Sequence, residues 1–245
     1  STERTESQVI AERLLDAAEN LNIRKPAAIW PDPLPERLYL PNLLADNIKG
    51  GWKDSTSKWT QSLPNNMEIS SDSTVYPIIG LCDQPAQQRQ TILQVDPSRG
   101  EGHLLIFGSG KTGKSTLLRT FVSSLVHTKS PLDAWIYILD FGGQSALKVL
   151  EGFPHVGAVI TRFELERAQR LIEFIHARIA ERNEIFRNAS MDSLADYNAN
   201  LKDKSQRLAT IYLIIDGFSN LKRTFLNTPG ASELVGSISS LVSGG

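Results

Sequence analysis

The stretch that decides the fold is Leu104–Ser115, which reads LLIFGSGKTGKS. Its first four residues are apolar and predict a short buried strand. Residues 116–122 place leucine, phenylalanine and valine at helical spacing and predict a helix. A strand, a turn of the form GxxxxGKS and a helix, in that order, make a P-loop, the loop that surrounds the phosphates of a nucleotide.

The chemistry of this loop follows from its residue types. Its glycines let the backbone adopt positive φ and bring N–H groups close to phosphate oxygens, while the positive end of the helix dipole faces the same place. Lys114 is placed to reach the outer phosphates, and the Ser115 hydroxyl to complete the coordination of Mg²⁺. We therefore predict that the chain binds a nucleoside triphosphate with Mg²⁺. The expected nucleotide-binding residues are Gly108, Ser109, Gly110, Lys111, Thr112, Gly113, Lys114, Ser115 and Thr116.

Composition places the chain among ordered globular proteins. Of its 245 residues, 40% are hydrophobic and 22% charged, and the formal net charge is -1. This balance argues against a wholly basic nucleic-acid-binding domain. The single cysteine, Cys82, excludes an intrachain disulfide, and the four histidines lack the spacing of metal ligands, so we predict no structural metal site.

The ends of the chain and its apolar runs bear on location. No apolar run approaches the roughly 18 residues that a membrane-spanning helix needs. The chain begins with Ser1 rather than methionine and ends with Ser243-Gly244-Gly245, so we expect a segment of a longer polypeptide. We expect this segment in the cytoplasm and any membrane anchor outside it.

The pattern divides the chain into an N-terminal region, residues 1–75, and a core, residues 76–245. In the first region, helical spacing predicts an amphipathic helix over residues 6–21. The prolines between residues 26 and 41 predict an extended strap, and the polar stretch 49–74 predicts a long loop or lid. We expect this region to pack on the core.

Short apolar or alternating runs in the core predict strands, and helical segments lie between them. The strands are expected at residues 77–81, 91–95, 104–107, 135–139, 156–160 and 211–215. The longest helix is expected over residues 164–187. Strands that alternate with helices indicate an α/β protein with a largely parallel sheet covered by helices on both faces.

The second half of a nucleotide site is expected after the strand at 211–215. Asp216 ends that strand, as does the acidic residue that holds Mg²⁺ through water in P-loop enzymes. The alternative is an aspartate that only starts the turn after a strand, and the presence of a P-loop favours the metal role. We predict Lys114 and Asp216 as catalytic residues, and Ser115 and Asp216 as metal ligands.

The next residue, Gly217, indicates how much catalysis to expect. Many P-loop ATPases carry a glutamate here that orients and deprotonates the attacking water. General-base assistance is worth about a hundredfold to ten-thousandfold in rate, so we predict weak hydrolysis with binding retained. Replacing Gly217 with glutamate is expected to raise turnover by restoring a base.

With these residues in view, the chain resembles the FtsK/SpoIIIE family of P-loop motors over about residues 76–245. The resemblance rests on the P-loop, ILDFGG at 138–143, FPHV at 153–156, RIAER at 178–182, Tyr197-Asn198 and Asp216. Within the family the chain looks most like the second ATPase domain of the EccC ATPases of type VII secretion. That likeness rests on AIWPDPLP at 28–35, GLCD at 80–83, QQR at 87–89, LDFGG at 139–143 and Asp216-Gly217-Phe218.

The resemblance implies a RecA-like sheet, ATP with Mg²⁺, and a place at the inner face of the cell membrane. The implied partners are neighbouring ATPase domains of the same polypeptide, the helical export-signal peptide of a secreted substrate, other secretion-machine subunits and a hexameric ring. In such a sheet a later strand inserts between the Asp216 strand and the P-loop strand, so we expect the polypeptide to continue beyond Gly245. We expect His155 to be a turn or packing residue. Four arginines are expected on the surface or in packing: Arg162, Arg178, Arg182 and Arg187. Asp140, at the end of a strand, is expected to contact the site indirectly.

Three functions compete at this point. The first is an ATP-binding domain of a type VII secretion ATPase with attenuated hydrolysis of ATP to ADP and phosphate. The second is a double-stranded DNA translocase, against which Gly217 and the lack of a basic DNA-reading module count. The third is a regulatory nucleotide switch without a transport role. DNA-stimulated turnover would support the second, and specific binding of a helical export-signal peptide would support the first.

Overall fold

The computed structural model describes residues 5–23, 32–53, 58–64, 76–96, 102–143, 145–228 and 233–244. Part of the predicted strap and much of the predicted loop at 49–74 lie outside the described residues. The chain forms two compact units. The first comprises Ser1–Pro35 and Cys82–Thr91, and the second comprises Glu36–Leu81 and Ile92–Gly245.

The first unit contains the predicted N-terminal helix, α1 (Glu6–Asn20). Helix α1 follows Thr5, whose backbone N–H donates to the side chain of Gln8 at 3.0 Å, as in a capping box. It ends where Asn22 takes a left-handed φ of 52°. The helix expected over residues 6–21 is thus confirmed, and none of its residues is buried.

The second unit is built on a parallel sheet whose described strands run in the order β6-β5-β7. Strand β5 spans Ala134–Asp140, β6 spans Val156–Thr161 and β7 spans Thr210–Asp216. Each confirms a predicted strand. Asp140 is in register with Thr161 on one side and with Asp216 on the other, so the three strands end at one edge of the sheet.

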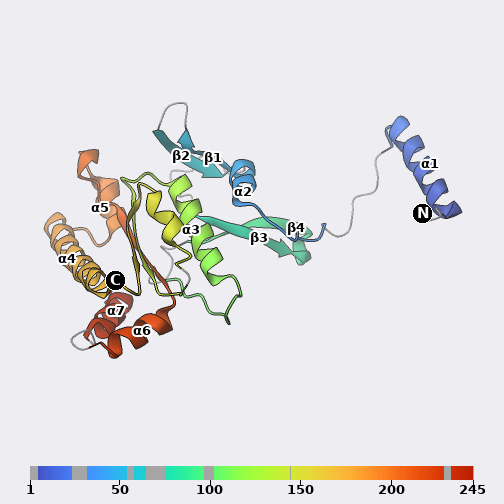
Figure 1. Cartoon of the computed structure of the whole chain (residues 1–245). Helices are drawn as coiled ribbons and strands as arrows, with labels where there is room; N and C mark the ends of the chain where they lie inside the picture. The colour runs from blue at the N-terminus through green and yellow to red at the C-terminus, as the bar shows by residue number, and fades with distance from the viewer. Residues whose placement is uncertain are drawn as a thin grey trace. The chain divides into compact units, whose positions relative to one another are not determined.

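Helices cover both faces of this sheet, as the sequence predicted (Figure 1). On one face pack α3 (Lys114–Thr128) and the short helix η2 (Lys148–Gly152). On the other pack α4 (Leu165–Ala189), α6 (Phe218–Leu226) and α7 (Glu233–Gly244). The α/β fold class is confirmed.

Strand β5 shows why both faces are covered. Ile136 and Ile138 are fully buried in the core on the α3 side, whereas Leu139 is fully buried in the core on the α4 side. Successive side chains of a strand point to opposite faces, so an apolar run without polar alternation requires two covers.

The remaining elements include one that replaces a predicted loop. Helix α2 (Leu40–Asn47) packs on Ile78 through its leucines. Strands β1 (Ile48–Lys53) and β2 (Lys58–Pro64) pair antiparallel, almost wholly within the stretch 49–74, so the loop prediction is wrong there. Hydrogen bonds between the two strands satisfy backbone groups of this polar sequence. The other elements are β3 (Ile78–Gln84), η1 (Pro85–Gln87), β4 (Arg89–Gln94), α5 (Leu194–Asn200) and η3 (Lys204–Gln206).

The predicted strand before the P-loop is not formed. Residues 104–107 take part in no strand pairing, and Leu105 and Phe107 are 71% and 84% exposed. Among the described strands β7 pairs only with β5, and no described strand pairs with residues 104–107. Backbone N–H and C=O groups form a strand only against a partner strand, which explains the difference.

Candidate nucleotide-binding site

The P-loop begins at Gly108 and turns into α3, as predicted. Gly113 has a positive φ of 92°, and α3 begins at the next residue, Lys114. The Thr112 hydroxyl donates to the carbonyl oxygen of Ser109 at 2.9 Å and closes the turn. A Cβ at Gly108 would lie 2.6 Å from the Thr112 hydroxyl oxygen, so any other residue there would displace the hydroxyl that closes the turn.

Lys114, the predicted phosphate-binding cation, folds back over the loop. Its ammonium donates to the carbonyl oxygens of Gly108 at 2.8 Å and Ser109 at 2.5 Å. Both acceptors are neutral, whereas phosphate oxygens are charged and accept stronger hydrogen bonds from an ammonium. The lysine can therefore exchange its loop partners for a phosphate.

The other predicted P-loop residues lie around this lysine. Gly110 and Lys111 form the exposed tip of the loop, and Lys111 has a left-handed φ of 62°. Thr116 lies in the first turn of α3 and is exposed. The structure thus gathers the predicted set at the N-terminus of α3, where the helix dipole favours anions.

Ser115 and Asp216, the two predicted metal ligands, lie against each other. The Ser115 hydroxyl donates to the Asp216 carboxylate at 2.5 Å across a sequence separation of 101 residues. Ser115 lies in the first turn of α3, and Asp216 is the buried last residue of β7. A hydroxyl and a carboxylate at this distance supply the hard oxygen donors that suit Mg²⁺, so the residues present fit the ion.

The end of β5 shapes the site on the far side of Asp216. A Cβ at Gly142 would lie 2.6 Å from the Asp216 carboxylate, so glycine leaves room for it. The buried Asp140 carboxylate accepts the N–H groups of Gly142 at 3.3 Å and Leu147 at 2.9 Å. Asp140 therefore orders the loop after β5 and reaches the site indirectly, through Gly142.

The residue after Asp216 lies in a turn without room for a side chain. Gly217 has φ 72°, and a Cβ there would lie 2.6 Å from the carbonyl oxygen of Phe141 and 2.9 Å from the nitrogen of Gly142. A glutamate would have to displace the end of β5. This geometry counts against the expectation that Gly217→Glu restores a base, because a side chain there would displace the Phe141-Gly142 backbone. No residue spacing in the sequence indicates this close approach.

Asn220, to which the sequence assigned no contact, closes the same turn. Its amide donates to the carbonyl oxygen of Phe141 at 3.1 Å, and its own oxygen accepts from Arg223 at 3.0 Å. The Phe141 N–H donates to the carbonyl oxygen of Asp216 at 2.9 Å, and its ring packs edge-on against Phe225 of α6. Phe141, which follows β5, thus contacts both the end of β7 and helix α6.

The arginines expected on the surface or in packing lie there. Arg182 donates to the carbonyl oxygen of Ala209 at 2.7 Å, Arg178 pairs with Glu181 at 2.6 Å on the surface of α4, and Arg187 is exposed. None of these contacts involves the P-loop or Asp216.

His155 and Arg162 also make packing contacts. The buried His155 ring has its Nε2 2.6 Å from the carbonyl oxygen of Lys129, and burial lowers its pKa. The Arg162 guanidinium lies 4.8 Å from the centre of the Phe163 ring. In the described part of the chain, His, Cys, Asp and Glu form no group of three or more that could hold a metal ion. Of the described helices, none has the length and apolar character to cross a bilayer.

The fold and the site define a RecA-like P-loop nucleotide-binding protein. The chain belongs to the FtsK/SpoIIIE family, whose model matches residues 78–242. The sequence resemblance stated above is confirmed, and membership of this family of ATPases implies nucleotide binding.

Named relatives come from type VII secretion. The chain is 36% identical over 148 residues to the ESX-4 secretion system protein EccC4 of Mycobacterium tuberculosis, a match that covers 60% of this chain and 12% of that protein. It therefore spans about an eighth of that relative. It also matches the cytoplasmic domain of the type VII secretion ATPase EccC of Thermomonospora curvata with a TM-score of 0.71 at 29% identity, over 89% of this chain and 24% of that one.

A second solved structure carries a ligand. ATPases 2 and 3 of Thermomonospora curvata EccC, in complex with a signal sequence peptide, match with a TM-score of 0.63 at 26% identity, over 90% of this chain and 36% of that one. These likenesses confirm the RecA-like fold. Because the relatives are secretion ATPases, they do not favour the DNA-translocase alternative.

Proposed function

We propose that this chain is an ATP-binding, motor-type domain of a type VII secretion ATPase, which powers or regulates protein export and hydrolyses ATP weakly. The observation that carries the proposal is the contact of Ser115 with Asp216 at the base of the P-loop. The neighbouring turn at Gly217, which has no room for a side chain, supports the expectation of weak hydrolysis.

Each site residue has a role that its position supports. Lys114 would turn from its two loop carbonyls to the outer phosphate oxygens of ATP. Ser115 would ligate Mg²⁺ through its hydroxyl, and Asp216 would accept hydrogen bonds from water on the ion. An Mg²⁺ ion held by these residues would neutralise negative charge on the phosphates of ATP.

Hydrolysis needs a group that orients and deprotonates water, and position 217 cannot supply it. A missing general base costs about a hundredfold to ten-thousandfold in rate. Binding does not depend on that group, so bound ATP would be converted to ADP much more slowly than in a fast motor. The domain would then act chiefly by whether ATP is bound.

Partners and location form a finer part of the proposal. We infer that the chain works beside other ATPase domains of the same polypeptide and other secretion-machine subunits, at the inner face of the cell membrane, in a hexameric ring. We infer that a helical export-signal peptide is a ligand of the assembly. The signal-peptide complex of a related EccC supports this inference.

The test is to measure ATP affinity and turnover on one purified sample, with and without double-stranded DNA. Tight binding with slow, DNA-independent turnover is expected. Fast turnover that DNA stimulates would overturn the proposal in favour of a DNA motor, and absence of ATP binding would overturn the site itself.

A further inference from the structure

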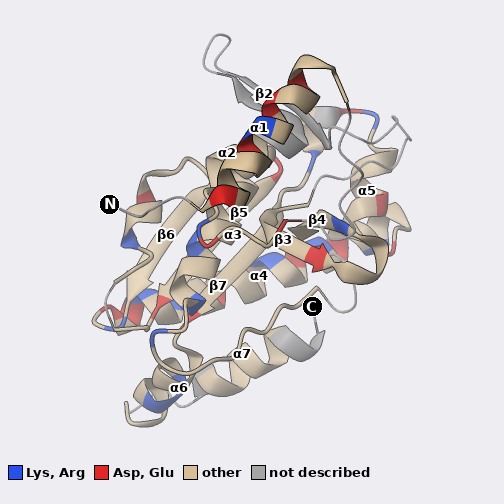
Figure 2. Cartoon of the chain, turned by 90° about the vertical axis from the view of Figure 1, so that its right-hand side faces the viewer, with Lys and Arg blue, Asp and Glu red and all other residues tan. Residues whose placement is uncertain are grey.

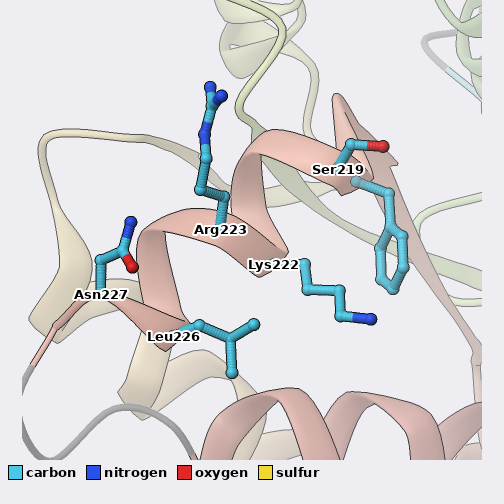
Figure 3. Close-up of a pocket in the computed structure, with 6 residues that line it drawn as sticks. Ser219, Lys222, Arg223, Leu226 and Asn227 are labelled. Carbon is cyan, nitrogen blue, oxygen red and sulfur yellow. The ribbon is translucent and has the colours of Figure 1, made fainter.

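A groove of about 410 Å³ runs along α6, the helix that follows the turn at Gly217. Its lining consists of Phe218, Ser219, Lys222, Arg223, Leu226 and Asn227, most of which Figure 3 labels. These residues form two rows at four-residue spacing, one through 218, 222 and 226 and the other through 219, 223 and 227. The trough between two such rows accepts a ridge of side chains from a second helix.

The groove offers apolar anchors to such a helix. Phe218 and Leu226 stand at the two ends of one row and are 44% and 53% exposed. Between them lies Lys222, whose stem can cover apolar surface while its ammonium stays in water. This arrangement fits an amphipathic helix with anchors three or four residues apart.

Charge selects the kind of helix. The charged side chains of the groove are both cations, Lys222 and Arg223, and α6 contains no acidic residue. Figure 2 shows Lys and Arg, and no Asp or Glu, on α6. A partner with carboxylates beside its apolar face is therefore attracted, and a basic partner is repelled.

Hydrogen bonds connect this groove with the nucleotide site. Arg223 lines the groove and donates to the Asn220 oxygen at 3.0 Å, and the Asn220 amide donates to the Phe141 carbonyl at 3.1 Å. The Phe141 N–H in turn donates to the main-chain carbonyl oxygen of Asp216, and the carboxylate of the same Asp216 accepts from the Ser115 hydroxyl. A helix that engages Arg223 therefore acts on a chain of contacts that ends at the proposed metal ligands.

We propose that the α6 groove docks an acidic amphipathic helix of a partner protein, and that Asn220 couples its occupancy to that of the nucleotide site. The coupling rests on the proposed binding of ATP at Lys114, Ser115 and Asp216. Each ligand then changes the affinity of the other by one common factor, because binding linkage is reciprocal.

Docking is tested with a fluorescent 15-residue helical peptide that carries leucines every three or four residues flanked by glutamates. A twin peptide with lysines in place of the glutamates is the control. The acidic peptide is expected to bind at least tenfold more tightly than its twin, and Lys222→Glu to weaken it about tenfold. Lys202→Glu makes the same charge change at an exposed site outside the groove and is expected to leave binding within twofold. Equal binding of the two peptides, or no effect of Lys222→Glu, overturns the docking surface.

Coupling is tested by repeating the titration with and without ATP and Mg²⁺. A change of about fivefold in peptide affinity is expected, with the same factor in ATP affinity when peptide is present. Asn220→Ala is expected to abolish that factor, and so is Asn220→Asp, which can accept from Arg223 but cannot donate to Phe141. A factor that persists in both folded variants, or is absent from the unaltered protein, overturns the coupling. ATP affinity without peptide is read separately, so loss of ATP binding identifies failure of the proposed function instead.

Discussion

The candidate site has two halves, the P-loop side and the turn at Gly217, and they are built in opposite ways. On the P-loop side, Lys114, Ser115 and Asp216 present an ammonium, a hydroxyl and a carboxylate, which contact one another or the loop. On the side of Gly217, backbone atoms fill the space where a side chain would start. We propose that the first half binds phosphate and metal and that the second provides no base, and from this we expect that binding and hydrolysis can be separated by mutation.

The largest expected effect breaks the binding half. Lys114→Ala removes the ammonium that would meet the outer phosphates, and hydrogen bonds to charged groups are worth about 1.5–3 kcal/mol. We expect ATP affinity to fall roughly tenfold to a hundredfold, measured by calorimetric titration.

The control for that change is Lys202→Ala, which removes an exposed lysine far along the sequence from the P-loop. It is expected to leave ATP affinity unaltered. Equal losses in the two variants would mean that Lys114 acts only through overall charge.

A second change probes the closed half. Gly217→Ala puts a Cβ into a left-handed turn, 2.6 Å from a backbone oxygen, and such strain costs about 1–3 kcal/mol. We expect a lower free energy of unfolding in urea. Gly217→Glu is expected to lose at least as much stability and to gain no turnover.

Gly236→Ala is the matched control, because a Cβ at Gly236 of α7 meets nothing within 4 Å. Alanine favours a helix over glycine by about 1 kcal/mol, so this variant should be as stable as the parent or more so. Faster ATP turnover in Gly217→Glu would show that the turn opens, and the separation of the two halves would not hold.

The sequence predicted the binding half well because its signals are local. Gly108 to Ser115 form one continuous motif, and Asp216 ends an apolar run, so strand, turn and helix follow from neighbouring residues. The closed half depends on a contact between Gly217 and Phe141, about 76 residues apart in sequence, which no local pattern encodes. The strand expected at 104–107 failed for the same reason, since a strand requires a partner that its own residues do not specify.

A third and smaller effect separates metal from nucleotide. Ser115→Ala removes the hydroxyl proposed to ligate Mg²⁺ while Lys114 stays in place. We expect Mg²⁺ to strengthen ATP binding about tenfold less than in the parent, since one bond to a charged group is lost. Titrations of ATP with and without Mg²⁺ measure this.

Thr116→Ala deletes a hydroxyl at the next, exposed position of α3 and controls for the loss at Ser115. It is expected to leave the Mg²⁺ dependence intact. If Thr116→Ala abolished that dependence and Ser115→Ala did not, the ion would lie elsewhere along the first turn.

The smallest effect concerns the turn that follows β6, at the same edge of the sheet. Side-chain hydrogen bonds hold this turn, whereas backbone atoms fill the turn at Gly217. The Glu164 carboxylate accepts from the backbone N–H of Thr161 at 3.0 Å and from its hydroxyl at 2.9 Å, and it pairs with Arg167. The bond from the Thr161 N–H is the main cause that lowers the pKa of Glu164 from 4.5 to about 2. A depressed carboxyl pKa stabilises the fold above the unfolded value, and this contribution is lost as pH falls toward 2.

Glu164→Gln keeps the shape of the side chain and removes its charge, so its stability deficit should be constant above pH 4.5 and shrink toward pH 2. Urea denaturation at a series of pH values measures this difference. The deficit of Gly217→Ala has no titrating group and should not narrow over the same range. Two variants at one edge of the sheet would then distinguish a turn closed by charge from one closed by backbone, and a Glu164→Gln deficit unchanged at pH 2 would remove that distinction.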